Sequence, residues 1–551
     1  MLDPAEIVSA ESSRGELPMR RVNCSATAFV GRALRGPVNR PTRTQSFAEF
    51  QQLFGGLWQP SALSYAVEQF FDNGGRDAVI VRVINGGAPP TLSLPCGDEV
   101  LTLRAVAPGT REFLRASIDY DNVNEQEDDR FNLVVQRLRM PGSERIESQE
   151  IFRAVSVSPT ASRFVGTVLR DSALVRLAGP APRLRPHKTF KAGSSHPVGY
   201  IPSNPDADDG AELSDYDVIG SADLHTGLFA LGQAEDIGFL YIPPLSRDTE
   251  IGASTLLVAV RFCRERRILL IVDPPAAWQS TQDAVHGWRE QNFCSDHAVM
   301  FFPRILANDR LRGRTEQFAN GGAVAGMIAR ADQQRSVWAL HEAEPELFLR
   351  AGTRPVFAVS ERDRWRLATH GINALTSLRS AAPIRPVPRT LAGGANASAE
   401  WAYLAPRRYA CFVVNSIDRG TRTFAANYID RFVWKRVTRA VTEFFQDLSR
   451  DGAFHGIAPE EAYFVACDDR VNTEYDLATG TLNVLIGFVG SRRAEYHCFL
   501  ITHRIDSSQV KTVCVNQLEL IASQEGILPI KAWTQNAAVY ERKFVPAAAP
   551  A

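Results

Sequence analysis

The sequence lacks several features that would assign it to a common functional class. Its net charge is −1 over 551 residues, so no excess of positive charge indicates binding to nucleic acid or to an acidic membrane surface. No uncharged apolar run is long enough to span a bilayer, and the N-terminal stretch has no apolar core of signal-peptide length. The eight cysteines form no C-x-x-C pair, which fits a reducing cytoplasm better than a disulfide-bonded secreted protein.

Catalytic and metal-binding motifs are missing as well. The chain contains no G-x-S-x-G nucleophile motif and no H-E-x-x-H zinc motif. Cys294 and His297 have a C-x2-H spacing, but two ligands do not close a zinc site, so we expect a buried cysteine beside a surface histidine. Four carboxylates within residues 468–476 do not follow the order of a calcium loop, which favours a solvated turn. We therefore predict no catalytic residue, no cofactor site and no metal site.

A glycine-rich stretch near the N-terminus is the best candidate for a nucleotide site. Gly31 and Gly36 have the spacing of the first half of a phosphate-binding loop. Such a loop continues with lysine and then serine or threonine, whereas this chain has Pro37 and Val38. Proline also removes one of the backbone N–H donors from which a phosphate cradle is built. The stretch therefore favours the end of a strand followed by a turn.

The first ninety residues predict strands and helices in alternation. Residues 25–31 have the pattern of a strand, and Ser46 with Glu49 forms a capping box that opens a short helix ending at a glycine pair. Ser61 caps a second helix, and residues 77–84 follow as a buried strand. This part of the chain therefore predicts a β-α-α-β unit.

The two following segments differ in pattern. Residues 91–200 contain short strands separated by proline, glycine and charged turns, which predicts a small all-β domain inserted into the chain. Residues 201–380 alternate strands with helices, which predicts a parallel sheet covered on both faces. Ligands bind such sheets beyond the carboxyl ends of the strands, but here Pro243-Pro244 and Pro274-Pro275 follow the first two strands. Because prolines stiffen these turns and remove donors, we interpret the sheet as a scaffold.

The last part of the chain predicts a further domain and a tail. A long amphipathic helix over residues 430–452 has its apolar side chains on one stripe, and three strands follow it. We predict an α/β fold, α+β overall, with several domains: an N-terminal linking arm (1–25), the first part of an α/β core (26–90), an inserted β-rich domain (91–200), the α/β core (201–380), a C-terminal α+β domain (381–505) and a C-terminal extension (506–551).

Five blocks of sequence together resemble the tail sheath proteins of contractile phage tails and related contractile injection systems. No single block is a chemical signature, but their order covers most of residues 25–505. Two departures stand out. The Pro-Gly-Val strand that often opens the family is only approximated by DPAEIVSAES, and this chain continues for more than forty residues after AEYHCFLITHRI. The blocks are TAFVGRALRGPVNRPTRTQSFAEFQQLFGG with YAVEQFFDNGGRDAVIVRV; TGLFALGQAEDIGFLYIPP with FCRERRILLIVDPP; GGAVAGMIARADQQRSVWAL; GINALTSLR with RTLAG and WAYLAPRRYACFVVNSIDRGTRTF; and FVWKRVTRAVTEFFQDLSRDGAFHGIAPEEAYFVACD.

The resemblance implies a structural subunit that is not an enzyme and uses no cofactor. Sheath proteins form stacked hexameric rings around an inner tube, meet baseplate and terminal cap proteins, and contract to drive the tube through a target envelope. The resemblance implies no contact with nucleic acid and no direct insertion into a membrane. It also implies assembly in the cytoplasm of the producing bacterium, followed by service as the sheath of a virion tail or an injection particle.

The resemblance further implies that terminal strands join the C-terminal sheets of neighbouring copies, which is an established mode of β-strand addition. The candidate strands are AEIVSA near the N-terminus and AEYHCFLITHRI near the C-terminus. The predicted exchange residues are Ala5, Glu6, Ile7, Val8, Tyr496, Cys498, Leu500 and Thr502.

The amphipathic helix supplies a second expected contact. Its basic residues precede its acidic ones, an order that opposes the helix dipole and that a partner could explain. In the resembling family a helix of this domain faces the tube, so we predict that Lys435, Arg436 and Arg439 contact acidic tube residues. A solvated polar face is the alternative interpretation.

Two other functions stay open at this point. The long C-terminal extension is compatible with a sheath-like paralogue that acts as a baseplate adaptor or a terminal ring. A nucleotide-using α/β enzyme is the more distant alternative, and the proline turns count against it.

Overall fold

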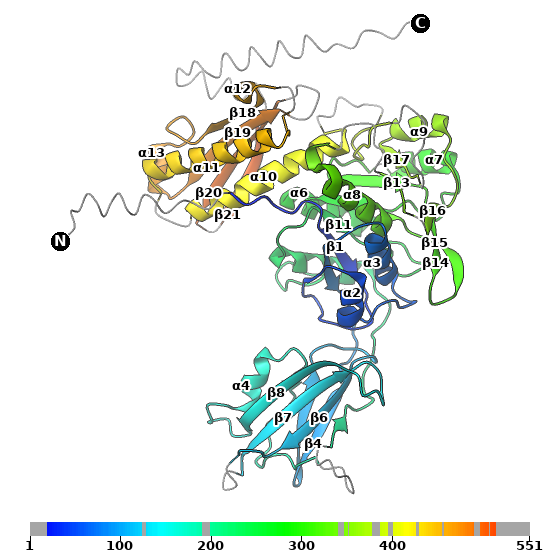
Figure 1. Cartoon of the computed structure of the whole chain (residues 1–551), viewed down its shortest axis with the longest axis vertical. Helices are drawn as coiled ribbons and strands as arrows, with labels where there is room; N and C mark the ends of the chain where they lie inside the picture. Colours follow the sequence, from blue (N-terminus) through cyan, green and yellow to red (C-terminus); the bar gives the residue numbers. More distant parts are fainter. Residues whose placement is uncertain are drawn as a thin grey trace, which may run out of the picture.

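The chain folds into three parts that can be followed in Figure 1: a central α/β part, a β-rich lobe below it, and a C-terminal unit beside it. None of the described helices is long and apolar enough to cross a membrane. The computed structural model describes residues 19–123, 128–189, 199–291, 293–339, 347–350, 352–376, 386–394, 401–425, 429–454, 457–489, 496–505 and 507–513.

The central part is built on one seven-stranded sheet. Six of its strands run parallel, and one short strand pairs antiparallel at an edge. The expected mixed α/β architecture is therefore confirmed, although the short edge strand was not predicted. In spatial order the strands are β17 (Ile372–Ala374), β13 (Ala298–Phe302), β12 (Leu269–Val272), β11 (Phe239–Tyr241), β1 (Thr27–Gly31), β3 (Ala78–Arg82) and β2 (Thr42–Thr44).

Successive residues of each strand point to opposite faces, and both faces are apolar. Phe29 and Ile80 lie in the core on one face, whereas Ala28 and Val79 lie in the core on the other. One face is covered by α2 (Phe47–Phe54), α3 (Ala62–Asp72) and α8 (Gly321–Arg335). The other face is covered by α5 (Asp215–Ile219), the 3-10 helix η2 (Gly227–Gln233), α6 (Ala253–Arg266), α7 (Thr281–Gln291) and α9 (Glu361–Ala368).

Helix caps in the first unit confirm the local predictions. The Ser46 side chain accepts a hydrogen bond from the backbone N–H of Glu49 at 3.2 Å. The Glu49 carboxylate accepts from the N–H of Gln45 at 2.7 Å, one residue earlier than in a standard capping box. The helix ends at Gly55, whose φ of 90° is a conformation that favours glycine. Ser61 caps α3 in the same way.

A small three-stranded sheet projects from the central part. It has the order β15 (Arg314–Phe318), β14 (Ile305–Asp309) and β16 (Thr353–Pro355), and all its pairs are antiparallel. The β14–β15 hairpin ends in a turn where Leu311 is half exposed.

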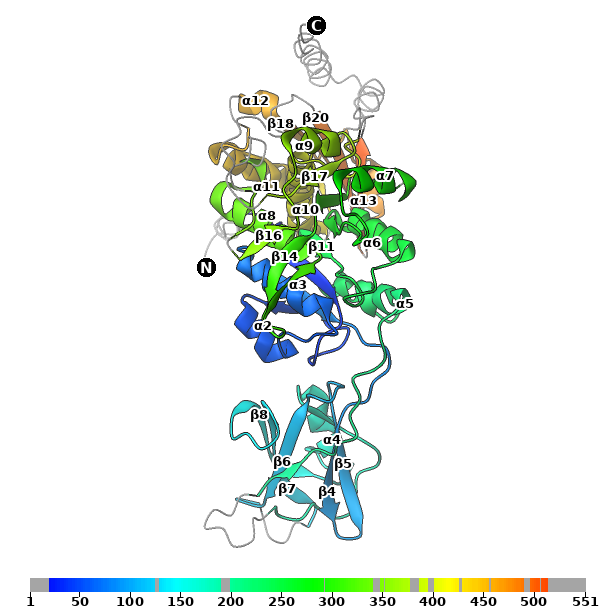
Figure 2. The ribbon, with the colours of Figure 1, turned by 90° about the vertical axis from the view of Figure 1, so that its right-hand side faces the viewer.

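The β-rich lobe is a pair of antiparallel sheets around a core of its own. Two chain segments connect it to the central part, as Figure 2 shows, and they pair at Asn85–Ala211 and Ala88–Asp208. One sheet has the order β10 (Ile201–Pro202), β6 (Phe113–Asp119), β7 (Arg130–Leu138) and β8 (Ile146–Ser156). The other has the order β4 (Thr91–Cys96), β5 (Glu99–Ala105) and β9 (Val175–Leu177). Along the chain, α4 (Val165–Val168) and η1 (Leu169–Asp171) connect β8 to β9.

The C-terminal unit packs two long helices, α10 (Leu404–Ala425) and α11 (Arg431–Arg450), on a four-stranded antiparallel sheet. The predicted apolar stripe of α11 is confirmed, since all its members are buried: Val433, Val437, Val441, Phe444, Phe445 and Leu448. The remaining elements, in chain order, are η3 (Val337–Ala339), α12 (Pro459–Ala462), β18 (Tyr463–Ala466), α13 (Glu474–Ala478), β19 (Leu482–Val489), β20 (Tyr496–Arg504) and β21 (Ser507–Val513).

Residues 19–25 join the central part to the C-terminal unit. The Val22 side chain is buried among those of α10 and α11, and its N–H donates to the Ser416 hydroxyl at 3.1 Å. The buried Arg408 guanidinium donates to Asp332 at 2.8 Å and so ties α10 to α8. Residues 19–25 therefore pack on their own subunit, and within the predicted arm only residues 1–18 fall outside the described chain.

Candidate functional sites

The glycine loop after β1 is arranged around a cation of the chain itself. Arg82 is 1% exposed, and its guanidinium donates to the carbonyls of Ala33 at 3.0 Å, Gly36 at 2.8 Å and Pro108 at 2.9 Å. A phosphate loop presents backbone N–H groups to an anion, whereas here carbonyl oxygens converge on a positive charge. A bound phosphate would find the acceptors already turned toward this site, so the loop has the opposite polarity to a nucleotide cradle.

The carboxyl ends of the parallel strands are closed in a similar way. Asp273 directly follows β12, and its carboxylate accepts from the N–H groups of Asn320 at 3.1 Å and Gly321 at 2.9 Å, at the start of α8. It also accepts from the Tyr241 hydroxyl at 2.6 Å. A helix N-terminus attracts anions, and in nucleotide-binding α/β folds this position holds a phosphate. Here the chain's own carboxylate holds it.

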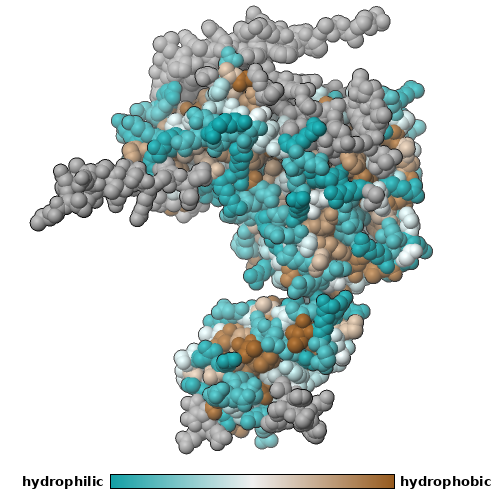
Figure 3. Space-filling model, viewed as in Figure 1, coloured by the Kyte–Doolittle hydropathy of each residue, from teal (hydrophilic) through white to brown (hydrophobic). Residues whose placement is uncertain are grey.

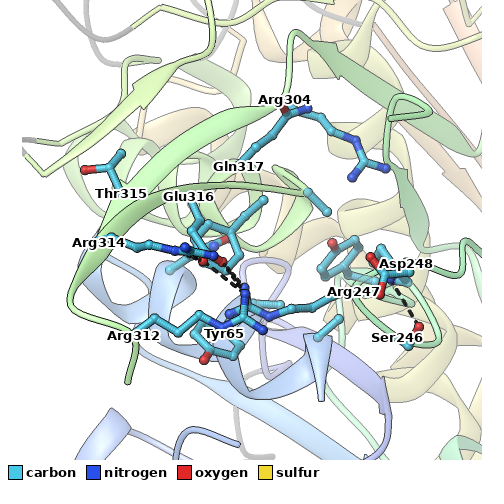
Figure 4. Close-up of a pocket in the computed structure, with 17 residues that line it drawn as sticks. Tyr65, Ser246, Arg247, Asp248, Arg304, Arg312, Arg314, Thr315, Glu316 and Gln317 are labelled. Carbon is cyan, nitrogen blue, oxygen red and sulfur yellow. Dashed lines mark hydrogen bonds and ion pairs between the residues drawn. The ribbon is translucent and has the colours of Figure 1, made fainter. Parts of the chain in front are cut away.

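A cavity of about 520 Å³ lies next to this edge, and Figure 4 shows its polar lining. Arg247, Arg312 and Arg314 all donate to the carboxylate of Glu316. Burial alone would raise the pKa of Glu316, but these hydrogen bonds outweigh it and lower the pKa to about 2. Arg247 also pairs with Asp309. The arginines are thus bound by the chain's own carboxylates, and the network holds the β14–β15 hairpin against the central part.

The two other candidates from the sequence also have structural roles. The prediction for the C-x2-H pair was wrong in both members, because Cys294 is exposed and His297 is 1% exposed. The His297 ring bonds the carbonyl of Ile268 at 2.8 Å through Nδ1 and faces Arg407 through Nε2, so both of its nitrogens have partners in the protein. The carboxylates of 468–476 cap a turn and pair with arginines, and no group of three possible metal ligands occurs among the described residues.

Helix α11 carries the predicted partner-facing cations on the surface of the C-terminal unit. Lys435 is exposed, and Arg439 is 63% exposed and lies 3.9 Å from Glu443. Arg436 is half-buried with its guanidinium 5.3 Å from the centre of the Phe424 ring, which makes it partly a packing residue. Phe432 on the same helix is 65% exposed, an apolar signal that charge patterning did not reveal. Figure 3 shows hydrophilic surface over this helix.

The C-terminal sheet has the order β18-β19-β20-β21, and its edges matter for any strand addition. Strand β20, which holds the predicted exchange residues Tyr496, Cys498, Leu500 and Thr502, pairs with β19 on one side and β21 on the other. The described pairs leave β18 and β21 at the two edges. The other four exchange residues, Ala5 to Val8, lie outside the described chain. Strand β21 was not predicted, because its sequence SSQVKTV is polar.

Comparisons by sequence identify no relative: no family model matches the chain, and no curated protein matches it. Comparison with solved structures does find similar folds. The sheath tail protein Lin1278 from Listeria innocua is 11% identical with a TM-score of 0.55, over 91% of this chain and 99% of that chain. The sheath of the PVC extracellular contractile injection system, in its contracted state, is 14% identical with a TM-score of 0.50, over 87% of this chain and 92% of that chain.

These likenesses extend over nearly the whole of both chains, so they concern the complete arrangement of parts and not one common module. The chain therefore has the fold of tail sheath proteins, and the resemblance seen in the sequence is confirmed at the level of the fold. The particular role of this chain is argued below, because a fold by itself does not establish a function.

Proposed function

We propose that this protein is a structural subunit of a contractile, tail-like sheath and not an enzyme. The observation that carries the proposal is the likeness of almost the entire chain to two sheath proteins, one of them in a contracted sheath complex. The closed glycine loop and the capped start of α8 support it, since the positions where an α/β enzyme holds a nucleotide are filled by Arg82 and Asp273.

In this proposal, copies form stacked hexameric rings around an inner tube and meet baseplate and cap proteins at the ends. The six segments proposed from the sequence have limits at residues 25, 90, 200, 380 and 505. They are the arm, the two parts of the core, the inserted lobe between them, the C-terminal sheath domain and the extension. Contraction is a rigid-body rearrangement of subunits between two packings, with the terminal segments keeping neighbours connected. The particle assembles in the cytoplasm of the producing bacterium.

Strand addition is proposed to occur at a sheet edge. Main-chain N–H and C=O groups at an open edge can pair with an incoming strand. Because β19 and β21 occupy both sides of β20, an N-terminal strand from another copy would meet β18 or β21 unless β21 is displaced. Charge favours the β21 edge: Lys511 on β21 and Arg504 at the end of β20 are exposed, whereas residues 1–18 hold four acidic residues and one arginine.

The tube contact is proposed to lie on the exposed face of α11, through Lys435, Arg439 and, to a smaller extent, Arg436. Each such exposed ion pair contributes only about 1 kcal/mol or less, which suits a surface that must separate from the tube in one stroke. The exposed Phe432 adds apolar area to the same face.

Electron microscopy of the purified chain, alone and with its tube protein, tests the proposal. We expect long tubes or ring stacks; isolated discs would instead favour a terminal ring or adaptor, and monomers at every concentration would contradict polymerisation.

Lys435→Glu with Arg439→Glu should prevent assembly on the tube, while Arg362→Glu with Arg366→Glu, exposed on α9, should not. Ile7→Pro should block strand addition because proline cannot donate to a ladder, and Ser12→Pro is its control.

A further inference from the structure

A cleft lies where the β-rich lobe meets the central part. It has a volume of about 930 Å³ and is lined from three directions. The segment from α2 to α3 forms one wall, the β7–β8 turn of the lobe forms another, and the tip of the β14–β15 hairpin closes a third side. A ligand in this cleft would touch both parts that the two connecting segments join.

Exposed apolar side chains gather in this cleft. Met140 is 55% exposed, Leu311 50% and Ile146 43%, and they come from the lobe and from the hairpin. Trp58 and Phe113 line the same cleft and are half-buried. Single exposed apolar residues need no explanation, but several that line one cavity mark a binding surface.

The cleft is also strongly basic. Arg35, Arg111, Arg139 and Arg145 line it, and Glu147 is the one carboxylate among its lining residues. Glu147 pairs with Arg35 at 2.6 Å. In the pocket of Figure 4 the arginines meet carboxylates of the chain, whereas this cleft is lined by three more arginines than carboxylates.

One arginine of the cleft is buried in its wall. Arg35 is 4% exposed. Its guanidinium is held by Glu147 and by the carbonyl of Gln52 at 2.9 Å, so Arg35 belongs to the wall, and the exposed cations of the cleft are Arg111, Arg139 and Arg145. The cleft thus fits a ligand that combines negative charge with apolar side chains.

We infer that the cleft is a receptor for an acidic, apolar segment of the chain's own C-terminal extension, residues 515–530, donated by a second copy. The segment VNQLELIASQEGILPI holds two glutamates, no basic residue and several large aliphatic residues. It thus matches the cleft in charge and in apolar character. This inference rests on the proposed polymerisation for the supply of the second copy, but the binding itself does not require polymers.

A second copy is the source because the reach within one copy is short. The described chain ends at Val513 on β21, in the C-terminal unit. Only residues 514–517 separate it from Leu518 and Glu519, where the acidic and apolar part of the segment begins. Four residues extend to at most about 15 Å. The C-terminal unit and the lobe lie at opposite ends of the vertical axis in both Figure 1 and Figure 2. Binding would fix the lobe of one subunit to the extension of the next.

Binding is measured by fluorescence anisotropy with a labelled synthetic peptide of residues 515–530 and the full-length chain. We expect saturable binding that weakens about tenfold or more in the Arg139→Glu, Arg145→Glu variant, because two charge-assisted contacts become repulsive. Arg104→Glu with Arg183→Glu, two exposed lobe arginines outside the cleft, should change the affinity less than twofold. The conservative Arg139→Lys, Arg145→Lys variant should retain binding, and circular dichroism checks that each variant is folded.

Equal weakening in the cleft variant and the control variant would overturn the inference, as would undiminished binding of a peptide with both glutamates changed to lysine.

The donor is identified by carbodiimide coupling in a mixture of ¹⁵N-labelled and unlabelled Arg139→Lys, Arg145→Lys chains. Coupling of Glu519 or Glu525 between labelled and unlabelled copies is expected, and coupling only within one copy would refute the second-copy donor. Peptide binding without tubes in the microscope would refute polymerisation alone, and tubes without peptide binding would refute this inference alone.

Discussion

Replacing Arg82 by methionine removes the cation around which the loop after β1 is arranged. Three carbonyl oxygens, those of Ala33, Gly36 and Pro108, then lose donors that lie 2.8–3.0 Å away. Each buried acceptor left without a partner costs roughly 1–3 kcal/mol, whereas removing a buried cation recovers part of its desolvation penalty. Methionine fills most of the same volume, so the cavity contribution is small. We expect the free energy of unfolding to fall by about 3–5 kcal/mol.

Urea denaturation followed by far-UV circular dichroism measures this loss as a shift of the midpoint at constant slope. Arg104→Met, at an exposed position of the lobe, is the matched control and should change stability by less than about 0.5 kcal/mol. Arg82→Lys should fall between the two, because an ammonium cannot reach all three carbonyls in the geometry of a planar guanidinium. A loss below about 1 kcal/mol for Arg82→Met would refute the reasoning that these carbonyls depend on Arg82.

Two further predictions concern packing and pH. Gly326→Ala on α8 should lower the melting temperature and reduce the free energy of unfolding by about 1–3 kcal/mol, although alanine is the better helix former. The reason is that the added Cβ would lie 2.2 Å from the carbonyl oxygen of Phe70. An unchanged melting temperature would contradict this close packing. Burial lowers the pKa of both His297 and His503 from 6.5 to about 4, so the folded state keeps them neutral while the unfolded chain protonates them. Their contribution to the free energy of unfolding is present above pH 6.5 and is lost as the pH falls toward 4, by roughly 2–3 kcal/mol in total for one histidine. Urea midpoints should therefore drop over this range, and they should drop less steeply in His503→Gln. Parallel pH profiles of this variant and the unchanged chain would refute the assignment for His503.

Much of the local structure could be predicted because its signals lie close together along the chain. The starts of α2 and α3 follow directly from the capping residues Ser46 and Ser61, and the buried face of α11 follows from its helical apolar spacing. Helix α10 was missed as a helix: most of its side chains are buried, and its polar residues Arg408 and Asp418 pair with other elements and do not face solvent. Strand β21 was missed for the opposite reason, since an exposed edge strand has few apolar residues.

The candidate sites could be predicted only in part. The argument against a nucleotide loop rested on missing residues, and it did not reveal that Arg82 occupies the loop from another strand. The exposure of Cys294 and the burial of His297 were inverted, because residue type is a weak guide where a loop turns between a surface helix and a strand. The cleft at the lobe was invisible, since its walls come from three separate parts of the chain.

The sequence by itself determined the helices with clear caps and faces, the inward and outward alternation of the strands, and the unsuitability of the loops for phosphate. These depend on neighbours a few residues away, so the physics is local. The tertiary structure decided which carbonyls surround Arg82, which carboxylate caps α8, which strands lie at the edges of the described sheets and where basic and apolar residues share a cleft. Each of these joins residues far apart in the chain, such as Arg35 and Glu147, and no local pattern records that they meet.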